Sequence, residues 1–432
     1  MNGPMAKKIL REAFDHVLNE TDPRRSFSKI EEVLDRIRDH SRLREGSVFI
    51  VAIGKIALPM SDELIERCRL ESPKGVVTMP HLKSKKRHDL RIFTGGHPYP
   101  NEDSLTSARH ALRLLTNAGE NELAVFLLSG GGSASFEIPL KKGVSLQDMK
   151  SFHRTLVGCG ANIIEMNTVR KHLSGVKGGR LAVAAAPARQ ITIMISNVPK
   201  GSESSIASGP TMPDESILEE MYDVIERYDL LPLFPVSIGR FIRSRAIPET
   251  PKEDDPAFRN AEFHCLLSNE DVLDEAKKFA EKRGWVCSID TTADDMRVDD
   301  ACDYLLRKLN LLKSRNRNRP VCIIAGGEVR SPVKGDGLGG RNQAFALECA
   351  TRIQSQPIAV LSGGTDGIDG NSPAAGGLVD GDTVDHAESS GMDTGDFRDR
   401  SDSHSLLNSL GDDIKTGPTG NNLCDLRMLV KW

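Results

Sequence analysis

The sequence predicts an α/β protein of two domains, and three observations support this. Short uninterrupted apolar runs, rich in β-branched residues, alternate with segments of helical periodicity, as in parallel sheets buried on both faces. The chain has 432 residues, more than one ordinary hydrophobic core accommodates. Prolines and an acidic cluster interrupt the periodicity near its middle. We therefore expect a Rossmann-like domain over 1–235, a proline-rich hinge over 236–258 and a second α/β domain over 259–432, both with largely parallel sheets.

The order of the elements follows from the same patterns. Apolar faces at helical spacing within 9–18 and 30–37 predict two amphipathic helices at the start. In the first domain, strands are expected at 48–53, 76–79, 91–94, 123–128 and 191–195. In the second domain, helices are expected at 269–283 and 296–312, and strands at 263–267, 285–289, 321–325, 357–361 and 426–430. The polar segment 380–405 is predicted to be an extended surface loop.

Composition excludes several classes of function. A formal charge of -4 gives no electrostatic reason to expect nucleic acid, and the basic runs at 83–87 and 313–319 are short enough to be solvated loops. No apolar stretch approaches the roughly 20 residues of a membrane helix, and the first residues have no signal-peptide core, so we expect no membrane and a cytoplasmic protein. The 8 cysteines include no C-x-x-C pair and the 11 histidines no metal-binding spacing, so the thiols are expected to be reduced.

Four expected strands run directly into glycine-rich or lysine-bearing loops. The strand at 321–325 precedes the glycine-dense segment 326–342, and the other three precede 54–55, 129–133 and 362–367. Glycines let backbone N–H groups approach a ligand closely, and a following helix N-terminus adds positive potential, which favours phosphate or carboxylate. Loops at the carboxyl ends of strands in an open sheet converge on one crevice. The sequence thus predicts an anion-lined cleft.

The glycine-dense segment 326–342 contains one partial match to a nucleotide-binding motif. Gly335, Gly337 and Gly340 satisfy G-x-G-x-x-G, but Gly335 lies about nine residues beyond the strand end, whereas the dinucleotide fingerprint starts at the strand end. A Walker A sequence occurs nowhere in the chain. The loops therefore do not indicate a Rossmann NAD site or a P-loop.

Two cationic features stand near these loops. Lys55 follows a buried strand at the expected first turn of a helix, where a cation opposes the helix dipole. If the cleft holds phosphates, we expect Lys55 to neutralise charge on a transferred phosphoryl group; the alternative is an ordinary solvated lysine. One helix face within the basic run 167–180 is formed by Asn167, Arg170, Lys171 and Ser174. This face either points at the cleft and holds an anion, or is an ordinary polar surface; the pattern fits both.

Several longer segments match one known family. They include Gly-His-Pro-Tyr-Pro-Asn-Glu at 96–102, Leu-Ser-Gly-Gly-Gly-Ser-Ala at 128–134 and Gly-Thr-Asp-Gly-Ile-Asp-Gly at 364–370, with further matches at 167–182, 206–211, 339–343 and 416–420. From Gly54 to the carboxyl end, the chain resembles the class II glycerate kinases, which carry a C-terminal MOFRL domain. The resemblance implies a two-domain enzyme that phosphorylates D-glycerate to 2-phosphoglycerate with ATP and Mg²⁺, in an active-site cleft between the domains.

The resemblance also implies site residues. Lys55 and Arg341 correspond to the family's lysine and arginine in the reaction pocket, and Asp366 and Asp369 are the expected Mg²⁺ ligands. The residues expected to bind ATP are Ser129, Gly130, Gly131, Gly132, Ser133, Lys171, Gly337, Gly339, Gly340, Thr365, Asp366 and Gly367. Arg341 is expected to hold either the glycerate carboxylate or the phosphates, since its planar fork suits both. No partner beyond these small molecules is expected, and the chain is expected to be a monomer or homodimer.

One segment departs from the family's pattern. Where the family usually has Ser-Asp-Val-Pro-Gly-Asp-Asp, this chain has Asn197 in place of the aspartate and Glu203 in place of the acidic pair.

Two other functions are alternatives to the kinase. Family members have been named hydroxypyruvate reductases, which use NAD(P)H, and a non-catalytic sensor of small acids would need the same cleft without turnover.

Overall fold

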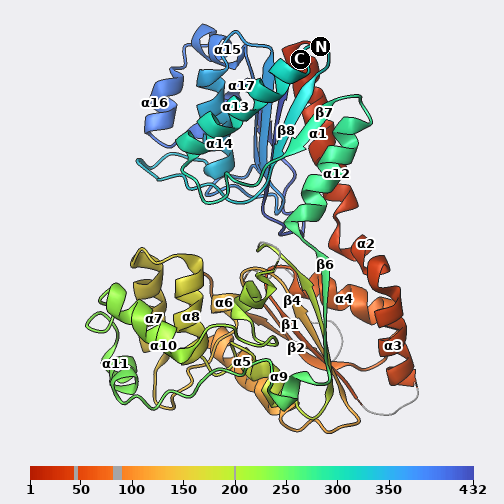
Figure 1. Cartoon of the computed structure of the whole chain (residues 1–432), viewed down its shortest axis with the longest axis vertical. Helices are drawn as coiled ribbons and strands as arrows, with labels where there is room; N and C mark the ends of the chain where they lie inside the picture. Colours follow the sequence, from red (N-terminus) through yellow and green to blue (C-terminus); the bar gives the residue numbers. More distant parts are fainter. Residues whose placement is uncertain (43–46, 81–89, 199–200) are drawn as a thin grey trace. The chain divides into compact units, whose positions relative to one another are not determined.

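The computed structural model describes residues 1–42, 47–80, 90–198 and 201–432. The basic run predicted at 83–87 lies outside them. Two compact units are formed, one from residues 26–266 and the other from residues 1–25 together with 267–432. Figure 1 labels the helices and strands of both units.

The unit of residues 26–266 is built on a sheet of strand order β3-β2-β1-β4-β5-β6. Neighbours from β3 to β5 pair in parallel, as expected. The strands are β1 Val48–Ile53, β2 Lys74–Met79, β3 Leu90–Thr94, β4 Leu123–Leu128, β5 Arg189–Ile195 and β6 Ala261–Leu267. The central β1 and β4 are buried along their whole length, which explains their uninterrupted apolar sequence.

Helices cover this sheet and extend beyond it (Figure 1). Those nearest the sheet are α3 Glu31–Arg42, α4 Ala57–Cys68, α5 Glu102–Leu115, α6 Gly132–Ser135 and α9 Arg180–Ala185, with the 3₁₀ segments η1 Phe27–Ile30, η2 Glu203–Ser208 and η3 Pro256–Phe258. A second hydrophobic cluster is formed between α7 Leu146–Gly158, α8 Ile163–Leu173, α10 Leu218–Arg227 and α11 Val236–Arg243.

The unit of residues 1–25 and 267–432 carries a mixed sheet of order β11-β10-β9-β12-β8-β7. Its strands are β7 Val286–Ile289, β8 Val321–Ala325, β9 Ile358–Gly364, β10 Gly376–Asp380, β11 Asp413–Ile414 and β12 Asp425–Lys431. The last strand, β12, lies between β8 and β9 and is antiparallel to both, and β10 is antiparallel to β9. The expected largely parallel sheet is therefore not found here, because an apolar run buried on both faces reads the same in either direction.

The helices of this unit are α1 Gly3–Glu20, α12 Asn269–Glu281, α13 Val298–Arg315, α14 Arg341–Arg352, α15 Thr383–Ser389, α16 Thr394–Asp399 and α17 Ser403–Leu410, and the short α2 Pro23–Ser26 follows α1. The surface loop predicted over 380–405 is wrong, since α15, α16 and the start of α17 lie there. These helices bury Val384, Ala387, Leu406 and Leu407, a small apolar share of a polar segment.

The expected domain boundaries also differ from the observed units. Helix α1 packs on α12 and β9 of the unit that contains the C-terminus, where Phe14 fills the space left open by Gly363. The expected hinge at 236–258 lies inside the other unit, where α11 contributes Ile238, Phe241 and Ile242 to a core. Strand β6, expected in the second domain, extends the first sheet. An amphipathic helix shows which face is buried but not which neighbour buries it.

Candidate active site

The loops that follow β1 and β4 are hydrogen-bonded to each other. The amide of Lys55 donates to the carbonyl of Gly130 at 2.9 Å, and the amide of Ser129 donates to the carbonyl of Ile53 at 2.9 Å. Gly54 has a φ of 118°, and a Cβ there would collide with the carbonyl and hydroxyl oxygens of Ser129. A glycine is therefore required at 54 for both conformation and space. The predicted convergence of these two loops is confirmed.

Lys55 lies beside the glycine loop 130–132. A Cβ on Gly131 would lie 3.2 Å from Cγ of Lys55 and 3.9 Å from Cδ2 of His97. Lys55 precedes the N-cap Ile56 of α4, so it stands in the turn before the helix and not in its first turn as expected. The half-buried lysine thus brings a positive charge to a loop whose backbone has no side chains to shield it.

A buried polar chain leads from this loop into the unit. The hydroxyls of Ser208 and Ser133 are 2.9 Å apart, and Oδ1 of Asn167 lies 3.2 Å from the Ser208 hydroxyl. The same Oδ1 accepts a hydrogen bond from Nη1 of Arg170 at 3.3 Å. The helix face predicted from Asn167 and Arg170 is therefore directed inward, and both residues are buried.

The neighbouring cations are neutralised by carboxylates. Nζ of Lys171 lies 2.9 Å from Oδ1 of the buried Asp214, so the predicted ATP-binding role finds this lysine already in an ion pair. Lys177 lies 2.5 Å from Oε2 of Glu137. Burial alone would raise the pKa of Glu137, but Lys177 and His153 outweigh it and lower the pKa to about 2.

Asn197 lies just beyond β5, which neighbours β4, so it stands at the same carboxyl edge of the sheet as the glycine loop. Position 197 is half-buried, and the hydroxyl of Ser196 before it donates to the carbonyl of Val198 at 3.0 Å. Glu203 starts η2. The departure from the family's pattern thus falls at the edge of the sheet where ligands bind in parallel α/β folds.

In the other unit, the glycines before α14 serve contacts within the protein. A Cβ on Gly337 would lie 2.5 Å from Cβ of Asp402, one on Gly339 would collide with the Ser403 hydroxyl, and one on Gly340 would collide with Asp369. The missing side chains let the loop lie flat against 400–403. Packing therefore accounts for these three glycines, which were predicted to bind ATP.

Arg341 begins α14 and pairs with two carboxylates of its own unit. Its Nε donates to Oδ2 of Asp425 at 2.7 Å, its Nη2 donates to Oδ1 at 3.0 Å, and Nη2 also lies 2.8 Å from Oε1 of Glu328. Burial would lower the pKa of Arg341, but Asp425 and Glu328 raise it above its ordinary value. Asp425 also pairs with the fully buried Arg427 at 2.9 Å. The guanidinium expected to hold either the glycerate carboxylate or the phosphates is thus hydrogen-bonded to Asp425.

Asp369 provides the N-terminal cap of α14. Its Oδ1 accepts the amide of Asn342 at 3.0 Å and its Oδ2 accepts the amide of Gln343 at 2.8 Å. The N-cap position itself is Gly340, which has no side chain to cap with. Burial raises the pKa of Asp369 to about 6, against the lowering effect of these two hydrogen bonds. The helix N-terminus predicted to attract a phosphate already holds a carboxyl group.

The loop after β9 is tied to the segment before β12. The hydroxyl of Thr365 donates to the carbonyl of Cys424 at 2.7 Å and accepts the amide of Leu423 at 2.8 Å. Gly367, with a φ of 83°, lies so close to the carbonyl of Gly417 that a Cβ would collide with it. Asp366 is half-buried, and its Oδ1 accepts the amide of Ile368 at 3.2 Å. Thr365 and Gly367 thus fix the loop that carries Asp366.

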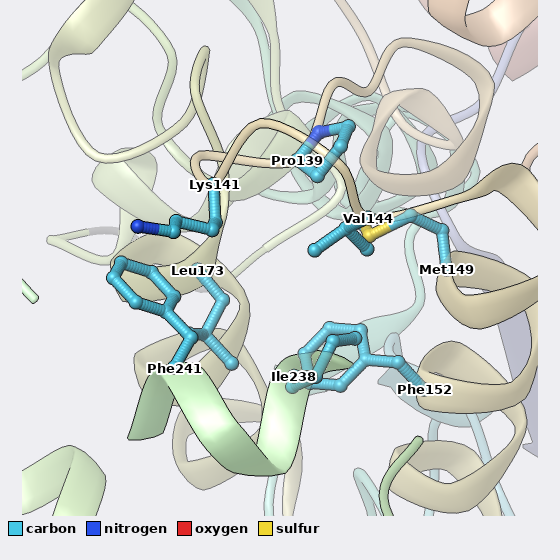
Figure 2. Close-up of a pocket in the computed structure, with 8 residues that line it drawn as sticks. All are labelled: Pro139, Lys141, Val144, Met149, Phe152, Leu173, Ile238 and Phe241. Atoms are coloured by element: carbon cyan, nitrogen blue, oxygen red, sulfur yellow. The ribbon is translucent and has the colours of Figure 1, made fainter. Parts of the chain in front are cut away.

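An apolar pocket lies elsewhere in the unit of residues 26–266. Figure 2 shows it lined by Pro139, Lys141, Val144, Met149, Phe152, Leu173, Ile238 and Phe241. None of the predicted site residues lines it, and Nζ of Lys141 lies 5.4 Å from the centroid of the Phe241 ring. It is a seam in the core between α7, α8 and α11 and lacks the converging polar groups of a substrate site.

Comparison with known proteins gives the family. A model described as a domain of unknown function, DUF4147, matches residues 9–243, and the MOFRL family model matches residues 321–425. A protein of Thermotoga maritima named D-glycerate 2-kinase is 37% identical, over 89% of this chain and 91% of its own. The crystal structure of a Thermotoga maritima glycerate kinase aligns with a TM-score of 0.84 and 35% identity, over 99% of this chain and all of the other. The chain belongs to the class II glycerate kinase family.

One relative in this family has another name. A protein of Agrobacterium vitis, provisionally named a hydroxypyruvate reductase, is 30% identical over 99% of this chain and 95% of its own. The family identified from the motifs and the expected α/β class are confirmed by the two Thermotoga maritima matches.

Asp366 and Asp369 are the expected Mg²⁺ ligands. Among residues 1–42, 47–80, 90–198 and 201–432, no group of three or more histidine, cysteine or acidic side chains is placed to hold a metal ion. Both oxygens of Asp369 accept backbone N–H bonds of α14, which argues against its expected role. Asp366 fits better, since Mg²⁺ in kinases is held by one or two carboxylates together with the substrate's phosphates.

Sequence reasoning missed the partners of the predicted cations. Asp425 was not predicted to contact Arg341, because β12 reaches it only through an antiparallel pairing that has no sequence pattern. Glu328, which follows β8, was not predicted as a partner either. Asp214 follows the recognised segment 206–211, but nothing in its spacing links it to Lys171. The one available clue was the basic run 167–180 itself, since a basic run needs counter-charges elsewhere in the chain.

Proposed function

We propose that this chain is a kinase that transfers the γ-phosphoryl group of ATP to the 2-hydroxyl of D-glycerate. The observation that carries the proposal is family membership over nearly the full length, together with Lys55 placed against a bare glycine loop. Phosphoryl transfer asks for positioning and charge neutralisation more than for covalent chemistry. Backbone and lysine together supply both.

In this proposal the loop from Ser129 to Ser133 approaches the phosphates, and Lys55 neutralises the charge that develops on the phosphoryl group during its transfer. The hydrogen bond between the Lys55 amide and the Gly130 carbonyl supports it, because it fixes the lysine's backbone to the loop it would serve. A positioned cation of this kind contributes about 3 kcal/mol to the transition state.

Arg341 is proposed to act on phosphate oxygens rather than on the glycerate carboxylate. Its bidentate contact with Asp425 supports this, because a guanidinium held from behind keeps a fixed direction while its charge still reaches a ligand. That Lys55 and Arg341 serve the same cleft stays a prediction.

Mg²⁺ is proposed to enter with ATP, and it would neutralise phosphate charge when bound. Asp366 is the protein carboxylate proposed to hold it, with Thr365 and Gly367 fixing its loop. The cytoplasmic location and the monomeric or dimeric state stay predictions of the sequence. In the described part of the chain, no helix has the length and apolar character needed to cross a membrane.

Reduction of hydroxypyruvate is the second candidate, favoured by the name of the Agrobacterium vitis relative. The structure gives it no support at Gly335, Gly337 and Gly340, since that motif follows β8 only after a long loop packed on 400–403. A parallel assay separates the candidates. Release of ADP with D-glycerate supports the kinase, NADH oxidation with hydroxypyruvate supports the reductase, and binding without either supports a sensor.

A further inference from the structure

Within the described part of the chain, Arg170 is the cation of the basic run 167–180 that keeps a buried side-chain nitrogen without a hydrogen-bond partner. Lys171 pairs with Asp214, Lys177 with Glu137 and His172 with Glu249. Arg180 donates to the carbonyls of Lys171 and Pro248. Burial lowers the pKa of Arg180, and the negative charges of Asp214 and Glu249 oppose this lowering. Within the residues that the structure describes, Arg170 forms no ion pair, and its printed hydrogen bond goes to the neutral Asn167.

Burial of the Arg170 guanidinium costs free energy of folding. Arg170 is 8% exposed, and its Nε is buried with no hydrogen-bond partner in the described part of the chain. Burial lowers its pKa from the ordinary value, and Glu137 opposes that only in part. Glu137 is itself paired with Lys177, so it faces two cations. In the described part of the chain, Nε of Arg170 keeps no partner, although a buried charge is stable only when it is paired.

The hydrogen bonds around Arg170 lead toward the glycine loop. Nη1 of Arg170 and the hydroxyl of Ser208 share Oδ1 of Asn167, at 3.3 Å and 3.2 Å. Ser208 in turn contacts Ser133, which belongs to the glycine loop beside Lys55. Hydrogen bonds through Asn167 and Ser208 thus link the guanidinium to the Ser133 end of the glycine loop.

We infer that Arg170 binds the carboxylate of the hydroxy-acid substrate at the Ser133 end of the glycine loop. Asn167 and Ser208 are positioning residues that orient the guanidinium and the hydroxyls toward that carboxylate. This assignment rests on the proposed kinase function, and it leaves Arg341, whose fork is occupied by Asp425, for the phosphates. A planar carboxylate supplies a negative charge and can accept the one N–H of Nε, which has no partner in the described part of the chain.

The test compares Arg170→Gln with the wild-type protein on two substrates, D-glycerate and its neutral amide, glyceramide. Loss of a charged hydrogen-bond partner predicts that KM for D-glycerate rises about 30-fold while KM for ATP changes less than about twofold. Glyceramide has no charge for Arg170 to match. The preference of kcat/KM for D-glycerate over glyceramide is therefore predicted to fall by the same factor of about 30.

Control variants separate binding from folding. Arg227→Gln changes an exposed arginine on the neighbouring α10, and it is expected to leave both substrates unaffected. Arg170→Lys keeps the charge without the planar fork and is expected to give an intermediate loss of preference, which also provides a folded variant if Gln unfolds the protein. Thermal melting of each variant checks folding.

The outcomes are distinct. An equal loss on D-glycerate and glyceramide would give Arg170 a purely structural role and overturn the inference, as would a rise in KM for ATP instead of glycerate. If the wild-type protein proves not to be a kinase, calorimetric titration with D-glycerate still decides: binding that Arg170→Gln abolishes supports the carboxylate site, and wild-type protein that does not bind overturns it.

Discussion

Arg341 donates two parallel hydrogen bonds to the carboxylate of Asp425, from Nε at 2.7 Å and from Nη2 at 3.0 Å. The arginine is the first residue of α14 and the aspartate the first residue of β12. Because β12 lies between β8 and β9, the last strand of the chain fixes the direction of a side chain that family resemblance places in the reaction pocket. The contact depends on arginine's planar geometry as much as on its charge.

Replacement of Arg341 by lysine should therefore impair the enzyme nearly as much as replacement by alanine. Lysine keeps the charge but cannot make two parallel bonds to Asp425, so its ammonium has no fixed direction. We expect kcat to fall about 100-fold or more in both variants. Full activity of Arg341→Lys would show that charge alone is sufficient at this position.

Lys55→Ala should lower kcat about 100-fold, because the charge near the glycine loop is lost from the transition state. Its half-buried side chain contributes little packing, so the melting temperature should change little. Lys141→Ala provides the control, since Lys141 is an exposed lysine of the same unit that lies over the Phe241 ring. Near-normal turnover of Lys55→Ala would exclude the catalytic role.

Gly54→Ala and Gly143→Ala form a matched pair. Both glycines have a positive φ, 118° and 88°, so each alanine carries a left-handed strain of roughly 1–2 kcal/mol. A Cβ at 143 meets nothing within 4 Å, whereas one at 54 collides with Ser129. Denaturant unfolding should show a larger loss of stability for Gly54→Ala, accompanied by lost activity. Equal losses would mean that the loops after β1 and β4 are less tightly joined than the structure indicates.

The pKa of about 6 for Asp369 predicts a pH-dependent stability. The folded protein binds the proton more tightly than the unfolded chain, whose aspartate has a pKa near 3.8, so this contribution is present below that pH and is lost as pH rises toward about 6. It amounts to about 3 kcal/mol at most.

Urea titrations at about pH 4 and about pH 7 would measure this for the wild-type protein and Asp369→Asn, which cannot ionise. The stability of the wild-type protein relative to the variant should fall between the two pH values. A rise instead would mean that the charged carboxylate, held by the N–H groups of Asn342 and Gln343, is the preferred form.

The extent to which the sequence predicted the site follows from the kind of contact involved. The meeting of Lys55 with the loop of Gly130 was predictable, because carboxyl ends of neighbouring parallel strands lie at one edge. The Asp425 contact was not, because it depends on the antiparallel insertion of β12. The cap formed by Asp369 was hidden for a similar reason, since capping rules relate residues a few positions apart and this one spans 27.

The fold shows the same division. Burial on both faces of β1 and β4 produced recognisable strands, whereas β10 begins with two glycines and β11 has only 2 residues, and they gave no comparable pattern. Helix α1 was expected from its spacing, but its docking on β9 depends on the space at Gly363, which only the folded chain reveals.

The position of the transferred phosphate shows whether this protein is a glycerate 2-kinase. Wild-type protein with Mg²⁺, ATP and D-glycerate should give a phosphomonoester whose phosphorus-31 signal is a doublet, because the phosphate of 2-phosphoglycerate couples to the single proton on C2. A triplet would place the phosphate on the C3 hydroxyl and contradict the assignment as a 2-kinase. The absence of any phosphomonoester, with ATP unconsumed, would contradict the kinase itself.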